Sequence, residues 1–265
     1  MVYLGAYKSS IIGNRMCDIT TEGAGFRTPP MNSGGQDCPL SVTPSAEDVF
    51  GEEASCLFLD PVTAVDIHEG NLPHWQQGNV IYFVTWHTAD ALPSAKRAEL
   101  REEKRLWIAR HPQPWDETTR QEYHTLFTPK LQEWLDAGNG ACVLRKPELA
   151  DIVGNALLHF DGTRCHIAAY VVMPNHVHVL FRLLGGERIE KLVKSWKGYT
   201  ANAINRCLAR SGVFWQDEYW DCIIRNDTHF ARCWEYIRMN PILANLSEGQ
   251  FAYYAAVPNN RSVNE

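Results

Sequence analysis

The chain has 265 residues, enough for one large domain or for one domain with attachments. Hydrophobic residues make up 45% and charged residues 21%, a balance typical of globular proteins that excludes wholesale disorder. The longest apolar run, residues 167–173, is far shorter than the roughly 20 residues that a membrane helix needs, so we expect no spanning segment.

The formal net charge of −6 is unevenly distributed along the chain. Residues 1–76 carry 3 Lys/Arg and 10 Asp/Glu, whereas residues 160–246 carry 11 Lys/Arg and 8 Asp/Glu. The acidic excess therefore lies near the N-terminus. The mildly basic stretch permits a nucleic-acid partner but does not require one.

The cysteines and the N-terminus bear on the cellular compartment. None of the 8 cysteines forms a C-x-x-C pair, which argues against a zinc knuckle. The first residues lack the charged start and apolar stretch of a secretory signal. We therefore expect reduced thiols in a cytoplasmic protein.

Residues 1–70 show no sustained apolar period and contain turn formers such as Thr28-Pro-Pro30. We expect them to form a poorly ordered acidic extension. Met16 and Met31 are alternative initiators, which leaves open whether part of this extension precedes the natural start.

Ordered structure is expected over residues 71–250, followed by a tail over residues 251–265. Residues 79–87 are rich in β-branched and aromatic side chains and predict a strand. A helical insertion over about residues 93–146 follows this strand. We expect its helices to begin after caps at Ser94 and Asp116, the second restarting at Pro129 and ending at Gly138.

Pro147 suits the first turn of a helix, and the apolar residues after it fall at i, i+3, i+4, i+7, i+8 and i+11. Residues 166–173 and 176–183 predict two strands joined tightly at Pro174-Asn175. A long helix with an apolar face over residues 189–207 comes next. A strand over residues 214–224 then leads to a last helix that begins at Asp227 or Thr228 and ends before Pro241.

This order of elements predicts an α+β fold, a ferredoxin-like antiparallel sheet with the helical insertion after the first strand and an extra C-terminal helix. We expect the helices to pack on one face of the sheet and the other face to be free for a site.

Two histidines, His176 and His178, flank Val177 within the second strand of the tight pair. Side chains alternate along a strand, so both imidazoles face the same side and could share a metal ion. The alternative is a pair of ordinary surface histidines.

Tyr236 and Asn240 are four residues apart in the last helix and therefore share one face. The tyrosine could be a nucleophile and the amide a neutral oxygen ligand. The alternative is a packed tyrosine and an asparagine that caps the helix before Pro241.

Basic residues recur along and after the long helix, with Trp196 and Tyr199 among them. Such a face could hold phosphates while an aromatic ring stacks on a base, but an ordinary amphipathic helix has the same pattern. Trp196 continues the apolar face and is more simply a core residue. The basic residues are Lys191, Lys194, Lys197, Arg206 and Arg210.

Together these blocks resemble a known family. The segment from Tyr170 to Leu180 with the sequence YVVMPNHVHVL is similar to the His-hydrophobic-His motif of the HUH endonuclease superfamily, and most similar to that of the REP-associated tyrosine transposases, relatives of the single-strand insertion-sequence transposases. Further blocks follow the family's order: LPHW at 72–75, SWKGYT at 195–200, FWQ at 214–216 and YIRMNP at 236–241.

The resemblance covers roughly residues 72–246. It implies that Tyr236 is the single nucleophile, that His176 and His178 are metal ligands, and that Asn240 is the third ligand. From the pattern of basic and aromatic residues we expect DNA contacts along the long helix and its flank, by Lys191, Lys194, Lys197, Tyr199, Arg206 and Gln216.

The implied activity is metal-dependent cleavage and rejoining of single-stranded DNA beside an imperfect hairpin, through a 5′-phosphotyrosine, with Mg²⁺ or Mn²⁺ as cofactor. The implied setting is the bacterial cytoplasm near the nucleoid, as a monomer or a homodimer. Two alternatives remain: a domesticated hairpin-DNA-binding protein with little or no catalysis, and a metalloprotein acting on small phosphoesters.

Overall fold

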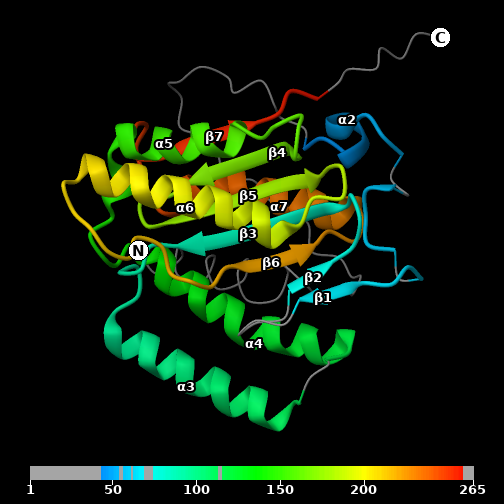
Figure 1. Ribbon diagram of the computed structural model, residues 1–265, viewed down its shortest axis with the longest axis horizontal. Helices are drawn as coiled ribbons and strands as arrows, with labels where there is room; N and C mark the ends of the chain where they lie inside the picture. The colour runs from blue at the N-terminus through cyan, green and yellow to red at the C-terminus, as the bar shows by residue number, and fades with distance from the viewer. Residues whose placement is uncertain (1–42, 54–55, 61, 69–73, 113–114, 259–265) are drawn as a thin grey trace.

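The computed structural model describes residues 43–53, 56–60, 62–68, 74–112 and 115–258. Its centre is a five-stranded sheet with the order β6-β3-β5-β4-β7, in which every neighbouring pair is antiparallel (Figure 1). Its strands are β3 (Ile81–His87), β4 (Cys165–Val172), β5 (His176–Leu183), β6 (Trp220–Ile223) and β7 (Ala252–Ala255).

The first four of these strands lie in the order fourth, first, third, second, which is the order of the ferredoxin-like plan. The helix α5 (Pro147–Leu158) leads into the second strand, and α6 (Ile189–Cys207) joins the third to the fourth. The predicted α+β fold and its tight β4–β5 hairpin are therefore confirmed.

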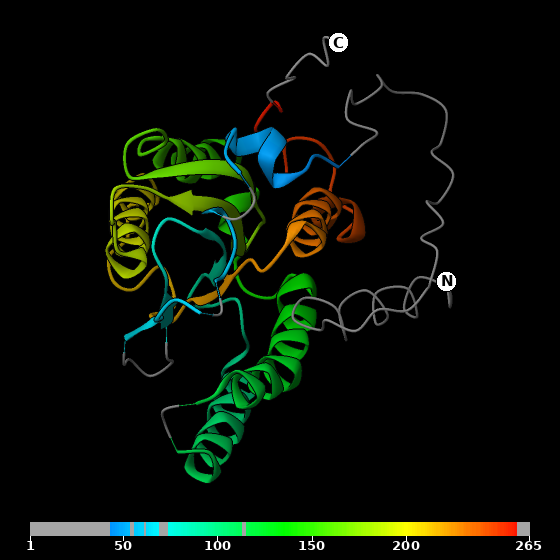
Figure 2. The same ribbon diagram turned by 90° about the vertical axis from the view of Figure 1, so that its right-hand side faces the viewer.

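Helices cover both faces of this sheet, as the side view in Figure 2 shows. On one face, α5 and α6 pack their apolar stripes against alternate strand residues such as Val84, Val179 and Phe181. On the other face, α7 (Asp227–Leu243) packs Phe230, Trp234 and neighbouring residues against Phe83 and Leu180.

The expectation that one face stays free was wrong, because α7 carries an apolar stripe of its own that must be buried. Phe230, Cys233, Trp234 and Ile237 follow the helical spacing i, i+3, i+4 and i+7, and all are at most 2% exposed. As a result β3 and β5 are buried along their whole length, including their histidines.

The helical insertion consists of α3 (Ser94–Arg110) and α4 (Glu117–Asp136), which lie below the sheet in Figures 1 and 2. It has a separate aromatic core that includes Trp107, Trp115 and Tyr123. Asp116 caps α4 as predicted, since Thr119 N donates to its side chain over 2.8 Å.

Two expectations about these helices were wrong. The N-cap of α3 is Pro93, which makes no side-chain cap bond, and Ser94 is the first helical residue. The second helix does not restart at Pro129 but runs unbroken to Asp136, since one proline removes only one backbone donor from a long helix.

Residues 1–42 lie outside the described residues, and the boundaries of the expected domains stay a prediction. Within the stretch expected to be poorly ordered, α2 (Ala46–Phe50) begins with a capping box at Ser45 and packs on α7. Leu57 is fully buried and its carbonyl accepts from Ile81 N. Described residues of this stretch such as Ala46 and Leu57 thus join the core, because their apolar side chains find partners on the sheet and on α7.

Short elements differ most from the sequence prediction. Of the strand expected over 214–224, only β6 (Trp220–Ile223) forms. It is preceded by an isolated bridge between Thr88 and Trp215. The last helix continues past Pro241 to Leu243. The hairpin of β1 (Asp66–His68) with β2 (His74–Gln76) and the edge strand β7 were not predicted.

Two further expectations concern thiols and membranes. Within the described part of the chain, Cys142, Cys165 and Cys207 are free thiols. No helix in the described ranges is both long and apolar enough to cross a membrane.

Candidate active site

The histidine pair lies on β5, in the middle of the sheet and on the face that α7 covers. His176 is 1% exposed and His178 is 0% exposed, and their ring centroids are 4.7 Å apart. Both alternate with Val177, which points into the opposite core. The strand therefore presents two adjacent imidazoles to α7, within a buried environment rather than on an open surface.

Each imidazole has a polar partner on its Nδ1 side. His176 Nδ1 lies 2.7 Å from Oδ1 of Asn175, and His178 Nδ1 lies 2.7 Å from the hydroxyl of Thr85 on β3. Thr85 is the residue directly opposite His178 in the antiparallel register. These contacts leave the Nε2 atoms of both rings facing the site.

Tyr236 approaches this pair from α7. Its hydroxyl lies 3.5 Å from Nε2 of His178, and the two rings are 5.0 Å apart at a steep angle. Phe83 packs against both, with its ring centroid 5.6 Å from that of His178 and 6.0 Å from that of Tyr236. The phenol of the last helix is thus within reach of the histidine pair in a single copy of the chain.

Asn240 follows one turn later on the same face of α7 and is 3% exposed. Its side chain donates a hydrogen bond to the Tyr236 hydroxyl, while its own Oδ1 is buried without a hydrogen-bond partner. His176 Nε2 is likewise buried without a partner. A buried polar atom without a partner costs free energy, so these two acceptors are suited to a ligand.

The electrostatics keep the phenol neutral. Burial raises the pKa of Tyr236 well above its usual value, and the negative charge of Asp136 raises it further. The hydrogen bond from Asn240 opposes both effects because it favours the phenolate. A proton must therefore leave Tyr236 before its oxygen becomes a strong nucleophile.

The histidines are held neutral by burial. Burial lowers the pKa of His176 to about 3 and that of His178 well below its usual value. His87, opposite His176 in the register, has a pKa lowered to about 4, first by burial and then by the positive charges of Lys197, Lys104 and Arg97. Neutral imidazoles can bind a cation without first losing a proton.

These depressed pKa values predict acid destabilisation. A histidine that stays neutral when folded but has a pKa of about 6.5 when unfolded stabilises the fold fully above pH 6.5 and loses that contribution as the pH falls toward about 4. We expect the free energy of unfolding, measured with urea and EDTA at pH 7, 6 and 5, to fall by roughly 1 kcal/mol per pH unit for each buried histidine. An unfolding free energy that is constant between pH 7 and pH 5 would contradict this.

The structure separates most predicted DNA contacts from this site. Lys191, Lys194, Tyr199 and Arg206 are exposed on α6, which covers the opposite face of the sheet. Tyr199 is 62% exposed and offers a free ring face. Any DNA that touches both α6 and Tyr236 has to pass around the sheet.

Two other predicted contacts lie at the end of the sheet. Gln216 is half-buried, and its backbone N–H donates to the carbonyl of His87 over 2.9 Å. Lys197 Nζ donates to the carbonyl oxygens of Gln216 and Asp217, each over 2.7 Å. Burial lowers the pKa of this lysine to about 8. Lys197 therefore holds the loop after Phe214 in place beside His87.

The residues around the pair that sequence reasoning missed are Thr85, His87, Asp136 and Asn175. His87 could have been noticed as a third histidine at the end of an apolar strand. Asp136 comes from the end of the helical insertion, and nothing in the local sequence places it beside Tyr236.

A metal ion would find two imidazole nitrogens and an amide oxygen here. No group of three or more His, Cys, Asp or Glu side chains within the described residues could hold a metal. The set of His176, His178 and Asn240 is of a different kind, since its third donor is an amide. The unpartnered Nε2 of His176 and Oδ1 of Asn240 fit such an ion.

Comparison with known proteins gives one family. The family described as "Transposase IS200 like" matches residues 141–240, which include the histidine pair, Tyr236 and Asn240. This confirms the relationship expected from the sequence blocks. No curated protein matches the chain.

Two solved structures are similar over much of the chain. A REP-associated tyrosine transposase bound to a REP hairpin is 15% identical and has a TM-score of 0.35, covering 66% of this chain and 73% of its own. A protein assigned as a transposase, from Deinococcus radiodurans R1, is 17% identical with a TM-score of 0.26, covering 62% and 93%. Likenesses at this level say nothing about the site.

Proposed function

Because residues 141–240 match the IS200-like transposase family, we propose that this chain cleaves and rejoins single-stranded DNA through a phosphotyrosine on Tyr236. The observation that carries the proposal is the 3.5 Å approach of the Tyr236 hydroxyl to His178. It brings the candidate nucleophile of α7 to the imidazoles of β5.

The proposed step exchanges one phosphodiester for another. The Tyr236 oxygen attacks phosphorus, the bond from phosphorus to the 3′-oxygen of the preceding nucleotide breaks, and that oxygen leaves as a 3′-hydroxyl after taking up a proton. The tyrosine proton is lost in the same step. Because the new bond has a similar energy, a second 3′-hydroxyl can reverse the reaction without ATP.

His176, His178 and Asn240 are proposed to hold a divalent cation, Mg²⁺ or Mn²⁺. When bound, such an ion supplies Lewis-acid stabilisation of the charge that develops on the phosphate. Asn240 also donates a hydrogen bond that favours the phenolate of Tyr236. Thr85 orients His178, and Phe83 keeps water from the rings.

The site as described is closed, since both histidines and Asn240 are at most 3% exposed and Tyr236 is 9% exposed. A phosphate can reach the Tyr236 hydroxyl only if α7 or a neighbouring segment moves. We propose that binding of the DNA strand provides the free energy for this opening.

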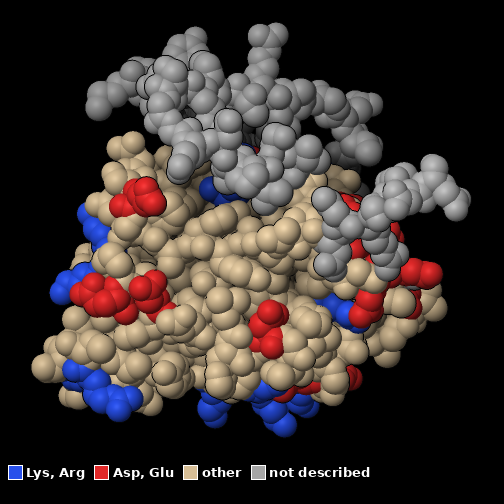
Figure 3. Space-filling model, turned by 90° about the horizontal axis from the view of Figure 1, so that it is seen from above, with Lys and Arg blue, Asp and Glu red and all other residues tan. Residues whose placement is uncertain are grey.

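A path for the strand is proposed from α6, around the end of the sheet past Gln216, to the histidine pair. The positive charges of Lys197, Lys104 and Arg97 all act on His87 at this end of the sheet, which suits an anionic backbone. In Figure 3, by contrast, the visible basic groups on the face above β7 and α5 are separated from one another by uncharged and acidic side chains.

This path predicts that α6 contributes to affinity rather than to chemistry. We expect Tyr199→Ala to weaken binding of a single strand by about tenfold, because base stacking contributes about 1–3 kcal/mol. Lys194→Ala should lower the salt slope of binding by about 0.7, the value for one lost phosphate contact.

Fluorescence anisotropy at several salt concentrations measures both effects. Lys130→Ala is the control, since its ammonium is held by Glu103 over 2.7 Å within the helical insertion. Unchanged affinity and salt slope in both α6 variants would remove α6 from the DNA interface.

Cleavage assays on end-labelled single strands taken from either side of hairpins near the gene test the proposed function. With Mn²⁺ or Mg²⁺, we expect a product with a free 3′-hydroxyl and a second product attached covalently to protein. The absence of any covalent product with either ion would refute the proposal.

One observation favours the binding-only alternative, a hairpin-DNA-binding protein with little catalysis. Tyr236 is buried and its pKa is raised well above the usual value, which is unfavourable for a nucleophile at rest. This alternative predicts tight binding of hairpin DNA with no covalent product under any condition of metal or pH.

A further inference from the structure

The loop between β4 and β5 places one side chain under unusual constraint. Asn175 is 1% exposed, and both ends of its amide are engaged. Its Nδ2 donates to the carbonyl oxygens of Leu135 over 3.2 Å and Asn139 over 3.0 Å, while its Oδ1 lies 2.7 Å from Nδ1 of His176. No role for Asn175 follows from the proposed chemistry alone.

The two carbonyls fix which way the amide points. A carbonyl oxygen can only accept, so the NH₂ group of Asn175 must face Leu135 and Asn139. Its oxygen then faces His176, and this oxygen can also only accept. The proton of the neutral His176 imidazole must therefore be on Nδ1, which leaves Nε2 with a free lone pair. The absence of any hydrogen-bond partner at the buried Nε2 agrees with this.

His178 has no comparable constraint. Its Nδ1 contacts the hydroxyl of Thr85, and a hydroxyl can donate or accept. The contact therefore leaves both tautomers open. Of these two histidines, therefore, His176 is the one whose tautomer is dictated by its hydrogen-bond partner.

The carbonyls that orient Asn175 belong to the helical insertion. Leu135 is in the last turn of α4 and is 1% exposed within the insertion's own core. Asn139 follows in the next turn, where its side chain donates to the carbonyl of Trp134 over 3.1 Å.

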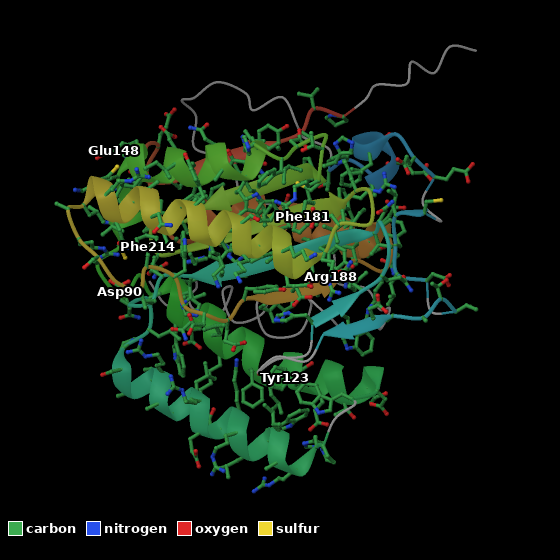
Figure 4. All side chains as sticks on the ribbon, in the orientation of Figure 1. Asp90, Tyr123, Glu148, Phe181, Arg188 and Phe214 are labelled. Carbon is green, nitrogen blue, oxygen red and sulfur yellow. The ribbon has the colours of Figure 1, made fainter. Side chains whose placement is uncertain are left out.

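The loop after α4 is also tied to the end of β3. Ala141 N donates to the side chain of Asp90 over 2.9 Å, and Asp90 lies where the chain leaves the sheet for the insertion (Figure 4). Gly140 has a φ of +87°, and a Cβ there would lie 2.6 Å from the carbonyl oxygen of Asp90. Thr88 N in turn donates to the backbone carbonyl of Asn175 over 2.8 Å.

We infer that Asn175 is a positioning residue, held by the end of the helical insertion, that keeps the proton of His176 on Nδ1 and its Nε2 free as a ligand. The insertion is thereby part of the active site and not only an appendage. The role of Nε2 toward a cation rests on the proposed function, whereas the tautomer does not. Partners that orient a ligating histidine typically contribute about 10- to 100-fold to metal affinity.

The tautomer is measured directly in long-range ¹H–¹⁵N correlation spectra of the imidazoles, recorded on the full chain without metal or DNA. The signals of His176 are assigned as those that disappear in His176→Gln. We expect a protonated Nδ1 and an unprotonated Nε2. A wild-type His176 with its proton on Nε2 would overturn the inference without recourse to any variant of Asn175.

Two variants separate the role of the Asn175 oxygen, which accepts from His176, from the role of its NH₂ group, which donates to the Leu135 and Asn139 carbonyls. Asn175→Ala removes the acceptor, and we expect mixed tautomers of His176 and Mn²⁺ binding weakened by about 10- to 100-fold in calorimetry. Asn175→Asp keeps an acceptor for His176 and should keep the Nδ1–H tautomer. Asn155→Ala, on the exposed side of α5, is the matched control and should change neither quantity.

An Asn175→Ala protein that is folded and retains both the wild-type tautomer and the wild-type Mn²⁺ affinity would refute the inference, as would loss of the Nδ1–H tautomer in Asn175→Asp. These readouts involve no DNA. If they come out as expected but wild type forms no covalent product with DNA, the proposed function fails and the role of Asn175 stands.

Discussion

Tyr236→Phe is expected to abolish the covalent protein–DNA product and to lower strand cleavage by on the order of 10⁴-fold or more, the scale of losing a covalent nucleophile. The ring remains and only its hydroxyl is lost. Its packing against Phe83 and His178 should therefore persist. Denaturing gels of reactions with labelled single strands, run beside a cleavage time course, measure both quantities.

Binding provides the control for this variant. The lost hydroxyl makes one hydrogen bond with Asn240 and a long contact to His178, so the cost in stability should be only about 1 kcal/mol. We expect the affinity for hairpin DNA to stay within about twofold of wild type. A Tyr236→Phe protein that still forms the covalent product would assign the nucleophile to another residue.

His176→Ala is expected to have the second largest effect. It removes the imidazole of the pair whose free Nε2 is set by its hydrogen-bond partner, so Mn²⁺ affinity should fall by at least about 100-fold, and cleavage with it. Treatment of wild type with EDTA should reproduce the loss of cleavage, and added Mn²⁺ should restore activity to wild type only.

The matched control is His166→Ala on the neighbouring strand β4. His166 lies near Asp161, and its side chain is 46% exposed. We expect this variant to retain wild-type Mn²⁺ affinity and cleavage. Full activity in His176→Ala, measured after exhaustive removal of metal and re-addition of Mn²⁺, would contradict the proposed role of the pair.

The helices and strands of the core could be predicted from the sequence because their apolar residues recur locally with a helical or strand period. The stripe that begins at Leu149 and the alternation through β5 predict α5 and the hairpin with no knowledge of the rest of the chain. The same alternation predicts that His176 and His178 share a face. It does not predict which element covers that face.

Contacts between distant segments could not be predicted from the sequence. The carbonyl of Leu135 that orients Asn175 lies about 40 positions earlier in the chain. The edge strand β7 has only four residues, too few to show an alternating pattern, and Tyr254 within it stacks on Tyr170 of β4. Lys197 reads as a phosphate contact because lysines on helices usually face water. Here its ammonium instead satisfies backbone carbonyls of the loop before β6.

Burial of the site was missed for a similar reason. An imidazole pair and a tyrosine suggest polar, accessible positions, whereas α7 and the sheet enclose them almost completely. This enclosure accounts for the depressed histidine pKa values and the raised pKa of Tyr236. It also means that opening of the site is part of the proposed reaction.

The most direct measurement is peptide mass spectrometry of wild-type protein trapped in reaction with a single strand and Mn²⁺, after digestion by trypsin and nuclease. We predict that a nucleotide remains bound through phosphate to the peptide of residues 233–238, at Tyr236. A nucleotide on any other peptide, or none under conditions in which the strand is cut, would contradict the account.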